Sequence, residues 1–156
     1  MSDQVSFRRA TRGDFEAVLG LASQLALHIE EDIPPLTRER FCSCYVGDAA
    51  PMHLLLALRA GHVVGMIAWT LTHELYSGHA RVYISDLSVD QTARGHGVGG
   101  ALMAQVKTWA RAHSAHKLAW EIWRHNHTAK AFYQSMGAQI DEGAIPFVVQ
   151  TEDLLA

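Results

Sequence analysis

The first half of the chain carries two kinds of apolar pattern. Between Phe15 and Ala26 the apolar residues recur at helical spacing, and the preceding Thr11-Arg12-Gly13-Asp14 resembles a capping box that marks a helix start. The later runs are strand-like and are separated by a turn at Arg59-Ala60-Gly61. This half is predicted to form strands at 5–8, 52–58 and 62–71 and helices at 15–26 and 37–45.

The second half centres on a long apolar run that leads into a glycine-rich loop. The run from Arg81 to Val89 is strand-like, and the segment from Gly95 to Gly100 contains four glycines in six residues. Further elements are expected as a helix at 98–112, a strand at 118–123, a helix at 128–136 and a last strand at 145–149. This order predicts an α/β sheet of mixed direction, with the glycine loop at the carboxyl end of a central strand.

The composition predicts one globular domain over residues 1–156. Hydrophobic residues make up 49% and charged residues 19% of the chain, which argues against disorder. A net charge of −3 offers no electrostatic footprint for nucleic acid. The sequence contains no apolar run near the roughly 20 residues of a membrane span, and Met1-Ser2-Asp3-Gln4 does not resemble a signal peptide. We therefore expect a cytoplasmic protein that binds neither nucleic acid nor membrane.

No metal site is expected from the histidines and cysteines. His113 and His116, and His125 and His127, are spaced like metal ligands, but no acid or thiol completes either pair. The two cysteines are separated by one residue, which fits neither a redox nor a zinc C-x-x-C motif.

The glycine loop has the features of a phosphate cradle. At the start of a helix, several backbone N–H groups have no intrahelical partner, and the helix dipole adds partial positive charge there. Glycine lets an anion approach this backbone because it has no Cβ. The loop is therefore predicted to bind a phosphate group of a ligand.

Two familiar phosphate loops fit less well. A Walker loop needs Lys-Ser or Lys-Thr after its last glycine, whereas Gly100 is followed by Ala101-Leu102. Gly95-x-Gly97-x-x-Gly100 satisfies the dinucleotide fingerprint, and Glu121 follows about 20 residues later. However, too little chain remains for a second mononucleotide-binding half, so an NAD-dependent oxidoreductase is disfavoured.

The second half contains two further motifs. One is Arg94-x-x-Gly97-x-Gly99, between a strand and a helix, and the other is Asn126-x-x-Ala129-x-x-Phe132-Tyr133-x-x-x-Gly137-Ala138. The first resembles the pyrophosphate loop of the Gcn5-related N-acetyltransferase (GNAT) superfamily, and the second resembles the other coenzyme A motif of that superfamily. The opening Phe7-Arg8-x-Ala10-Thr11-x-x-Asp14 also fits, so the resemblance covers essentially the whole chain.

Within the superfamily, the sequence most resembles the diamine acetyltransferases, the branch that acetylates spermidine, spermine and thialysine. Tyr83-x-x-Asp86-Leu87-x-Val89 is similar to a segment of that branch. The resemblance implies a single domain with a mixed central sheet of about six to seven strands, splayed at an acetyl-CoA wedge and covered by helices on both faces. It also implies a homodimer.

The resemblance further implies that acetyl-CoA binds between the strand ending at Val89 and the strand ending near Trp123. The loop amides and Arg94 would hold the pyrophosphate, and the strand edge would hold the pantetheine arm and the thioester carbonyl. The residues expected to contact the coenzyme are Leu87, Ser88, Val89, Arg94, Gly95, His96, Gly97, Val98, Gly99, Gly100, Asn126 and Ala129.

Acetyl transfer to an amine needs a base and an acid. An alkylamine has a pKa of about 10.4 and is mostly protonated at neutral pH, so a carboxylate should remove its proton directly or through water. Asp86 is the leading candidate for this base because an acid in an apolar strand must find a partner or face a cleft. Tyr133 matches the tyrosine that serves as the acid in the superfamily and would protonate the departing thiolate.

The predicted acceptor site is less acidic than that of the diamine branch. That branch has a glutamate where this chain has Ser85, and Tyr-Glu where this chain has His28-Ile29. The expected acceptor is therefore a primary amine of a small molecule, either a diamine, a polyamine or an amino-acid-like compound. The alternatives are a peptide or protein N-acetyltransferase and a non-catalytic acyl-CoA-binding module. Residues expected to contact the acceptor are His28, Glu30, Glu31, Glu74, Ser85, Glu121 and Glu142.

Overall fold

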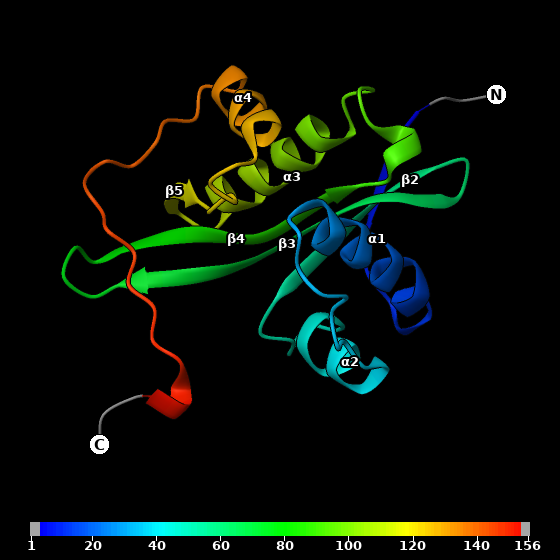
Figure 1. Cartoon of the computed structure of the whole chain (residues 1–156), viewed down its shortest axis with the longest axis horizontal. Helices are drawn as coiled ribbons and strands as arrows, with labels where there is room; N and C mark the ends of the chain where they lie inside the picture. Colours follow the sequence, from blue (N-terminus) through cyan, green and yellow to red (C-terminus); the bar gives the residue numbers. More distant parts are fainter. Residues whose placement is uncertain (1–3, 154–156) are drawn as a thin grey trace. The chain divides into compact units, whose positions relative to one another are not determined.

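The computed structural model describes residues 4–153. Residues up to Trp123 form one compact unit and residues from Arg124 form a second (Figure 1). The first unit contains β1 (Ser6–Arg9), η1 (Arg12–Asp14), α1 (Phe15–His28), α2 (Arg38–Tyr45), β2 (His53–Arg59), β3 (His62–Glu74), β4 (His79–Val89), η2 (Gln91–Ala93), α3 (Val98–Ala112) and β5 (Ala115–Ala119). The second contains α4 (His127–Ser135) and η3 (Thr151–Asp153).

The strands form one five-stranded mixed sheet in the order β1-β2-β3-β4-β5. The first four strands pair antiparallel, and β4 and β5 pair parallel. This parallel pair is connected by α3, as a parallel crossover requires. The α/β class and the mixed sheet predicted from the sequence are both confirmed.

Helices cover both faces of the sheet. On one face, alternate residues of β2 (Leu54, Leu56 and Leu58) pack in a core cluster with Phe15 of α1 and Phe41 of α2. The rings of these two phenylalanines lie 5.7 Å apart. The opposite face of β3 packs against α3, so the sheet is a central layer between α1 and α2 on one side and α3 on the other.

Gly65 lets α3 approach β3 closely. A Cβ at this position would lie 3.1 Å from Cγ1 of Val98, 3.2 Å from Cδ1 of Leu102 and 3.3 Å from the carbonyl oxygen of Ser88. Both contacted side chains belong to the first turns of α3. The missing side chain at Gly65 therefore sets the distance between the N-terminus of α3 and β3.

The variant Gly65→Val is expected to lower the free energy of unfolding by about 1–3 kcal/mol, because three branched carbons cannot fit in this contact without moving α3. Chemical denaturation measures the loss. Gly20→Ala is a suitable control, since its new Cβ would have nothing within 4 Å and Gly20 lies exposed in α1. That variant should gain about 0.5–1 kcal/mol from the better helix propensity of alanine. Equal stability of the Gly65→Val and wild-type proteins would mean that α3 is not in close contact here.

The expected count of six to seven strands was wrong, since the described residues form five. The predicted strand at 118–123 is replaced by β5, which starts and ends earlier because it pairs with β4 only from Ala80 to Tyr83. The predicted strand at 145–149 is not a strand. Its apolar side chains are exposed, and Phe147 is 94% accessible. Pro146 removes a backbone donor from this run, and no described strand pairs with it.

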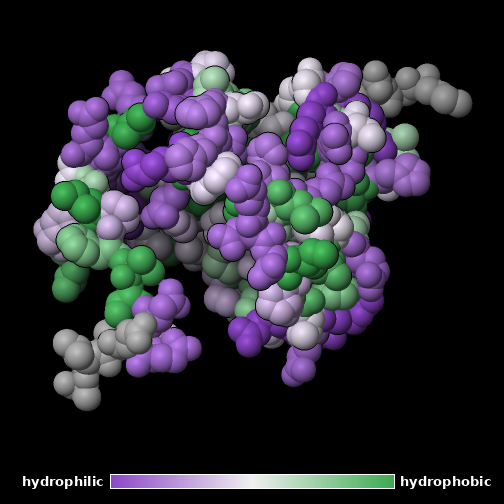
Figure 2. All heavy atoms as spheres, viewed as in Figure 1, coloured by the Kyte–Doolittle hydropathy of each residue, from purple (hydrophilic) through white to green (hydrophobic). Residues whose placement is uncertain are grey.

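Most of the surface in the view of Figure 2 is hydrophilic, interrupted by separate apolar patches. Among residues 4–153, no helix combines the length and the apolar character that crossing a membrane requires.

Candidate functional site at the end of β4

The second half of β4 has one unpaired edge. It pairs with β3 from His79 to Val89, but its pairing with β5 ends where Tyr83 lies opposite Ala119. From Ile84 to Val89, no described strand occupies that second edge. The backbone N–H and C=O groups on this edge have no strand partner among the described residues, although the Val89 carbonyl accepts a hydrogen bond from Arg94 Nε.

A β-bulge at Ser85 interrupts β4 beside this edge. Asp86 lies opposite Ala68 and Ile84 lies opposite Trp69, so Ser85 is an extra residue on this strand. Its hydroxyl donates a 2.6 Å hydrogen bond to Oδ2 of Asp86. Two residues of the acceptor and catalytic predictions are thus in direct contact.

Asp86 lies on the face of the sheet that α1 and α2 cover, because its partner Ala68 belongs to the core cluster of that face. Burial, and then the negative charge of Asp86, raises the pKa of Tyr45 at the end of α2. Burial, followed by the charge of Glu121, raises the pKa of Tyr83, with a smaller contribution from Asp86. Asp86 thus interacts electrostatically with both tyrosines, and Glu121 interacts with Tyr83.

Neither tyrosine was assigned a role from the sequence. Tyr83 belongs to the motif Tyr83-x-x-Asp86-Leu87-x-Val89. Its position three residues before Asp86 is the signal from which a role for Tyr83 could have been predicted. Nothing in the sequence points to Tyr45, since its electrostatic interaction with Asp86 depends on how α2 packs on the sheet.

The glycine loop connects β4 to α3. Gly95 has a φ of +77° and Gly97 a φ of +78°, in the left-handed region where other residues are strained. Gly97 is the N-cap of α3, and its carbonyl accepts the first intrahelical bond, from the Ala101 N–H. Among the described residues, no oxygen accepts a hydrogen bond from the N–H groups of the first three helical residues, Val98, Gly99 and Gly100. They remain available to an anion.

The space over the loop is open. An added Cβ at Gly95, Gly97 or Gly100 would meet no atom within 4 Å. No described side chain therefore occupies the space that a Cβ would take at these three glycines. The geometry fits the predicted phosphate cradle.

The side chain of Arg94 connects the start of the glycine loop to the end of β4. Its Nε donates a 3.0 Å hydrogen bond to the carbonyl oxygen of Val89, and its own carbonyl oxygen lies 2.8 Å from Nδ1 of His96. The bond to Val89 involves only Nε, and no oxygen in residues 4–153 accepts a hydrogen bond from the two Nη groups. The guanidinium can thus contact a ligand while keeping its structural bond. Ser88, by contrast, is buried, and its hydroxyl donates to the carbonyl oxygen of Leu21.

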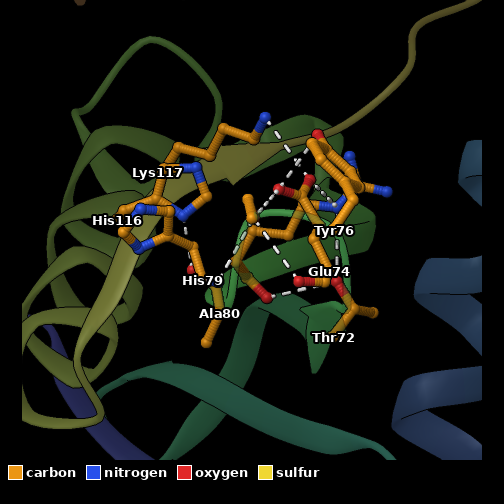
Figure 3. A network of polar contacts seen from close by, with 9 residues as sticks. Thr72, Glu74, Tyr76, His79, Ala80, His116 and Lys117 are labelled. Atoms are coloured by element: carbon orange, nitrogen blue, oxygen red, sulfur yellow. Dashed lines mark hydrogen bonds and ion pairs between the residues drawn. The ribbon is translucent and has the colours of Figure 1, made fainter.

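Glu74 lies in a network of polar contacts at the far end of the β3–β4 hairpin (Figure 3). Its carboxylate accepts hydrogen bonds from Ser77 Oγ at 3.1 Å and Tyr76 Oη at 3.3 Å. Arg81 Nε and Lys117 Nζ lie 3.6 Å and 3.5 Å from its Oε1. Partial burial opposes ionisation, yet the bond from Ser77 and the charge of Lys117 lower the pKa of Glu74. A substrate ammonium at Glu74 would have to share this carboxylate with two cations.

The other predicted acceptor residues of the first unit are exposed. His28 is the last residue of α1, and Glu30 and Glu31 follow it in the chain. Glu30 has a left-handed φ of +61°. Glu121 follows β5 in an irregular segment. Glu121 and Asp86 both interact electrostatically with Tyr83, whereas Glu74 forms its own network.

The remaining predicted residues lie in the second unit. Asn126 is the N-cap of α4, and its Oδ1 accepts a 3.0 Å hydrogen bond from the Ala129 N–H. Tyr133 is half-buried on the same helix, its ring 5.0 Å from that of Phe132, and burial raises the pKa of its hydroxyl. Glu142 is exposed beyond α4. Among the described residues, no three His, Cys, Asp or Glu side chains gather as metal ligands do.

Comparison with known proteins decides the family. The profile described as "Acetyltransferase (GNAT) family" matches residues 23–138. The chain belongs to the GNAT family. It is therefore an acetyl-CoA-dependent acyltransferase by family. The matched GNAT segment contains Asp86, the whole glycine loop and Tyr133.

Solved structures show the GNAT fold at low identity. An integron cassette protein from the mobile metagenome of V. cholerae is 22% identical with a TM-score of 0.79, and the match covers 96% of this chain and 94% of that one. A mutant of the BH1408 protein from Bacillus halodurans is 25% identical with a TM-score of 0.80, over 93% and 99% of the two chains. An aminoglycoside acetyltransferase from an uncultured soil metagenomic sample, solved with sisomicin, is 17% identical with a TM-score of 0.77, over 94% and 95%. No curated protein matches this GNAT sequence significantly.

Proposed function

We propose that this protein transfers the acetyl group of acetyl-CoA to a primary amine of a small molecule. The observation that carries the proposal is the open glycine loop at the N-terminus of α3, directly beyond the unpaired edge of β4. One element offers free N–H groups to a pyrophosphate, and the other offers an extended backbone edge to an amide-containing arm.

The residues present fit acetyl-CoA. The N–H groups of the loop from Gly95 to Gly100 would bind the pyrophosphate, together with the free Nη groups of Arg94. The backbone from Leu87 to Val89 would pair with the pantetheine arm, and an N–H group there would stabilise charge on the thioester oxygen, an interaction worth several kcal/mol. When bound, acetyl-CoA supplies an acetyl thioester. In the second unit, Asn126 and Ala129 are proposed as further contacts, as the family resemblance implies.

Asp86 is proposed to receive the proton of the acceptor amine, directly or through a water molecule. It is half-buried beside the bulge, and the Ser85 hydroxyl already donates to one of its oxygens. Its second carboxylate oxygen remains able to accept a proton. An amine that has lost its proton has a free electron pair with which to attack the thioester carbon.

Tyr133 is proposed to protonate the departing thiolate. Burial raises the pKa of its hydroxyl above the ordinary value of a phenol, so this group carries its proton throughout the neutral pH range. The motif around it, from Asn126 to Ala138, supports the same role.

The acceptor is proposed to be a small amine that needs no second positive charge, whether diamine, polyamine or amino-acid-like. The ion pairs of Glu74 with Arg81 and Lys117 leave fewer unpaired carboxylates for a polyamine than the diamine branch would offer. The fold shared with aminoglycoside acetyltransferases supports a small-molecule acceptor. The homodimer implied by the family resemblance is also part of this proposal.

A panel of amines tests the substrate class. The purified protein is mixed with acetyl-CoA and one amine at a time, and the released thiol is measured. At least one monoamine or amino acid should release thiol well above the rate of hydrolysis without amine, at a rate comparable to that with spermidine. Activity confined to peptides, or far higher with spermidine and spermine than with every other amine, would contradict the proposed acceptor.

A further inference from the structure

The side chain of Gln24 bridges α1 and the first two residues of the loop that follows β4. Its Nε2 donates a 3.0 Å hydrogen bond to Oδ2 of Asp90, and its Oε1 accepts a 3.2 Å hydrogen bond from the Gln91 N–H. The bridge thus joins residues 66 and 67 positions apart in the sequence. Both ends of one amide are used, one as a donor and one as an acceptor.

The bridge lies at the point where β4 becomes the loop. The Asp90 N–H donates to the carbonyl oxygen of Val64, which is the last backbone bond between this end of β4 and β3. Oδ1 of Asp90 accepts a 2.9 Å bond from the Thr92 N–H and so starts η2. Asp90 therefore sets the direction of the chain toward Gly95, and Gln24 holds Asp90.

A second contact joins the same two elements. The Ser88 hydroxyl donates to the carbonyl oxygen of Leu21, which lies one turn before Gln24 on the same side of α1. This bond fixes the end of the strand, whereas the Gln24 bridge fixes the start of the loop. The hydrogen bond from Arg94 Nε to the Val89 carbonyl oxygen then connects the start of the glycine loop to the end of β4.

We infer that Gln24 is a positioning residue for acetyl-CoA binding, acting through Asp90 and Gln91 on the glycine loop. The inference rests on the proposed function, because it assumes that the loop binds the coenzyme. Loop N–H groups already held in place bind a pyrophosphate more tightly than mobile ones, since less conformational entropy is lost on binding. Gln24 suits this role because its amide donates to the carboxylate through Nε2 and accepts from the N–H through Oε1 at the same time.

Two variants of the full chain test the inference. Gln24→Leu keeps the approximate size of the side chain and loses both hydrogen bonds. Gln24→Glu keeps only an acceptor and places a second carboxylate beside Asp90. Titration calorimetry should show a Kd for acetyl-CoA about 10-fold higher for Gln24→Leu, and higher still for Gln24→Glu. Hydrogen exchange of the amides at 91–97 should accelerate in both, and kcat should stay within twofold of wild type while KM for acetyl-CoA rises.

Ser23→Ala is the matched control. It removes a side-chain hydrogen bond from the neighbouring residue of α1, but that bond goes to the Leu19 carbonyl within the same helix. Its Kd for acetyl-CoA should equal that of wild type. If wild type binds acetyl-CoA and the Gln24 variants bind it as tightly as Ser23→Ala does, the positioning role is wrong and the proposed function stands. If wild type itself does not bind acetyl-CoA, both are overturned.

Discussion

Replacing Tyr133 with Phe is expected to lower kcat by about 100-fold. The change removes one hydroxyl and keeps the ring that packs beside Phe132. A positioned acid contributes about 10²- to 10⁴-fold to a rate, and a thiolate is a good leaving group, so the lower end of that range applies. KM for acetyl-CoA should change much less, because the lost interaction belongs to the transition state. Steady-state kinetics with an amine identified by the panel measures both constants.

Tyr76→Phe is the control for this experiment. It also removes a tyrosine hydroxyl, but one that donates to Glu74 at the far end of the β3–β4 hairpin. Its kcat should remain close to that of wild type. A Tyr133→Phe protein with a kcat within about threefold of wild type would make Tyr133 a packing residue and leave thiolate protonation to water or another group.

Gly97→Val should weaken acetyl-CoA binding by about 100-fold or more. The new side chain would project into the open space over the loop, where the pyrophosphate must approach. Losing two hydrogen bonds to a charged group, at about 1.5–3 kcal/mol each, accounts for an effect of this size. Titration calorimetry measures the change in Kd, and circular dichroism verifies that the variant is folded.

Backbone strain is a second effect of Gly97→Val, and Gly61→Val isolates it. Gly61 has a φ of +80°, close to the +78° of Gly97, and lies in the turn between β2 and β3 with nothing within 4 Å of an added Cβ. Both variants should lose about 1–2 kcal/mol of stability from the left-handed backbone. Only Gly97→Val should bind acetyl-CoA more weakly than the wild-type protein does. Similar affinities in the two variants would show that the loop does not bind the coenzyme.

Local patterns in the sequence predicted the elements whose signals are themselves local. The helix predicted at 98–112 matches α3, since its glycine start and apolar stripe are both readable from consecutive residues. The strands predicted at 62–71 and 81–89 match β3 and β4, although β3 extends to Glu74 and β4 begins at His79. These elements carry the glycine loop, so its place between a strand and a helix was predictable, while its binding of a phosphate remains a prediction.

Features that depend on distant partners were not predictable in the same way. The strand expected at 145–149 has the right composition, but a strand also needs a neighbour, and composition alone does not supply one. The bulge at Ser85 appears only when β4 is aligned with β3. Gln24 is an ordinary polar helix residue in the sequence, and its role arises from two contacts made far along the chain. The roles of Asp86 and Tyr133 remain predictions.

The bulge at Ser85 also bears on how this protein avoids edge-to-edge aggregation of its sheet. An unpaired strand edge invites an extended segment of another chain to add to the sheet, which leads to aggregation. On β4 the free edge begins beside an extra residue that disrupts the regular ladder and increases the local twist. A flat incoming strand cannot stay in register across such an interruption, whereas a flexible small molecule can bond to a few groups on one side of it. The irregularity that leaves this edge open to a ligand thereby protects it from other protein chains.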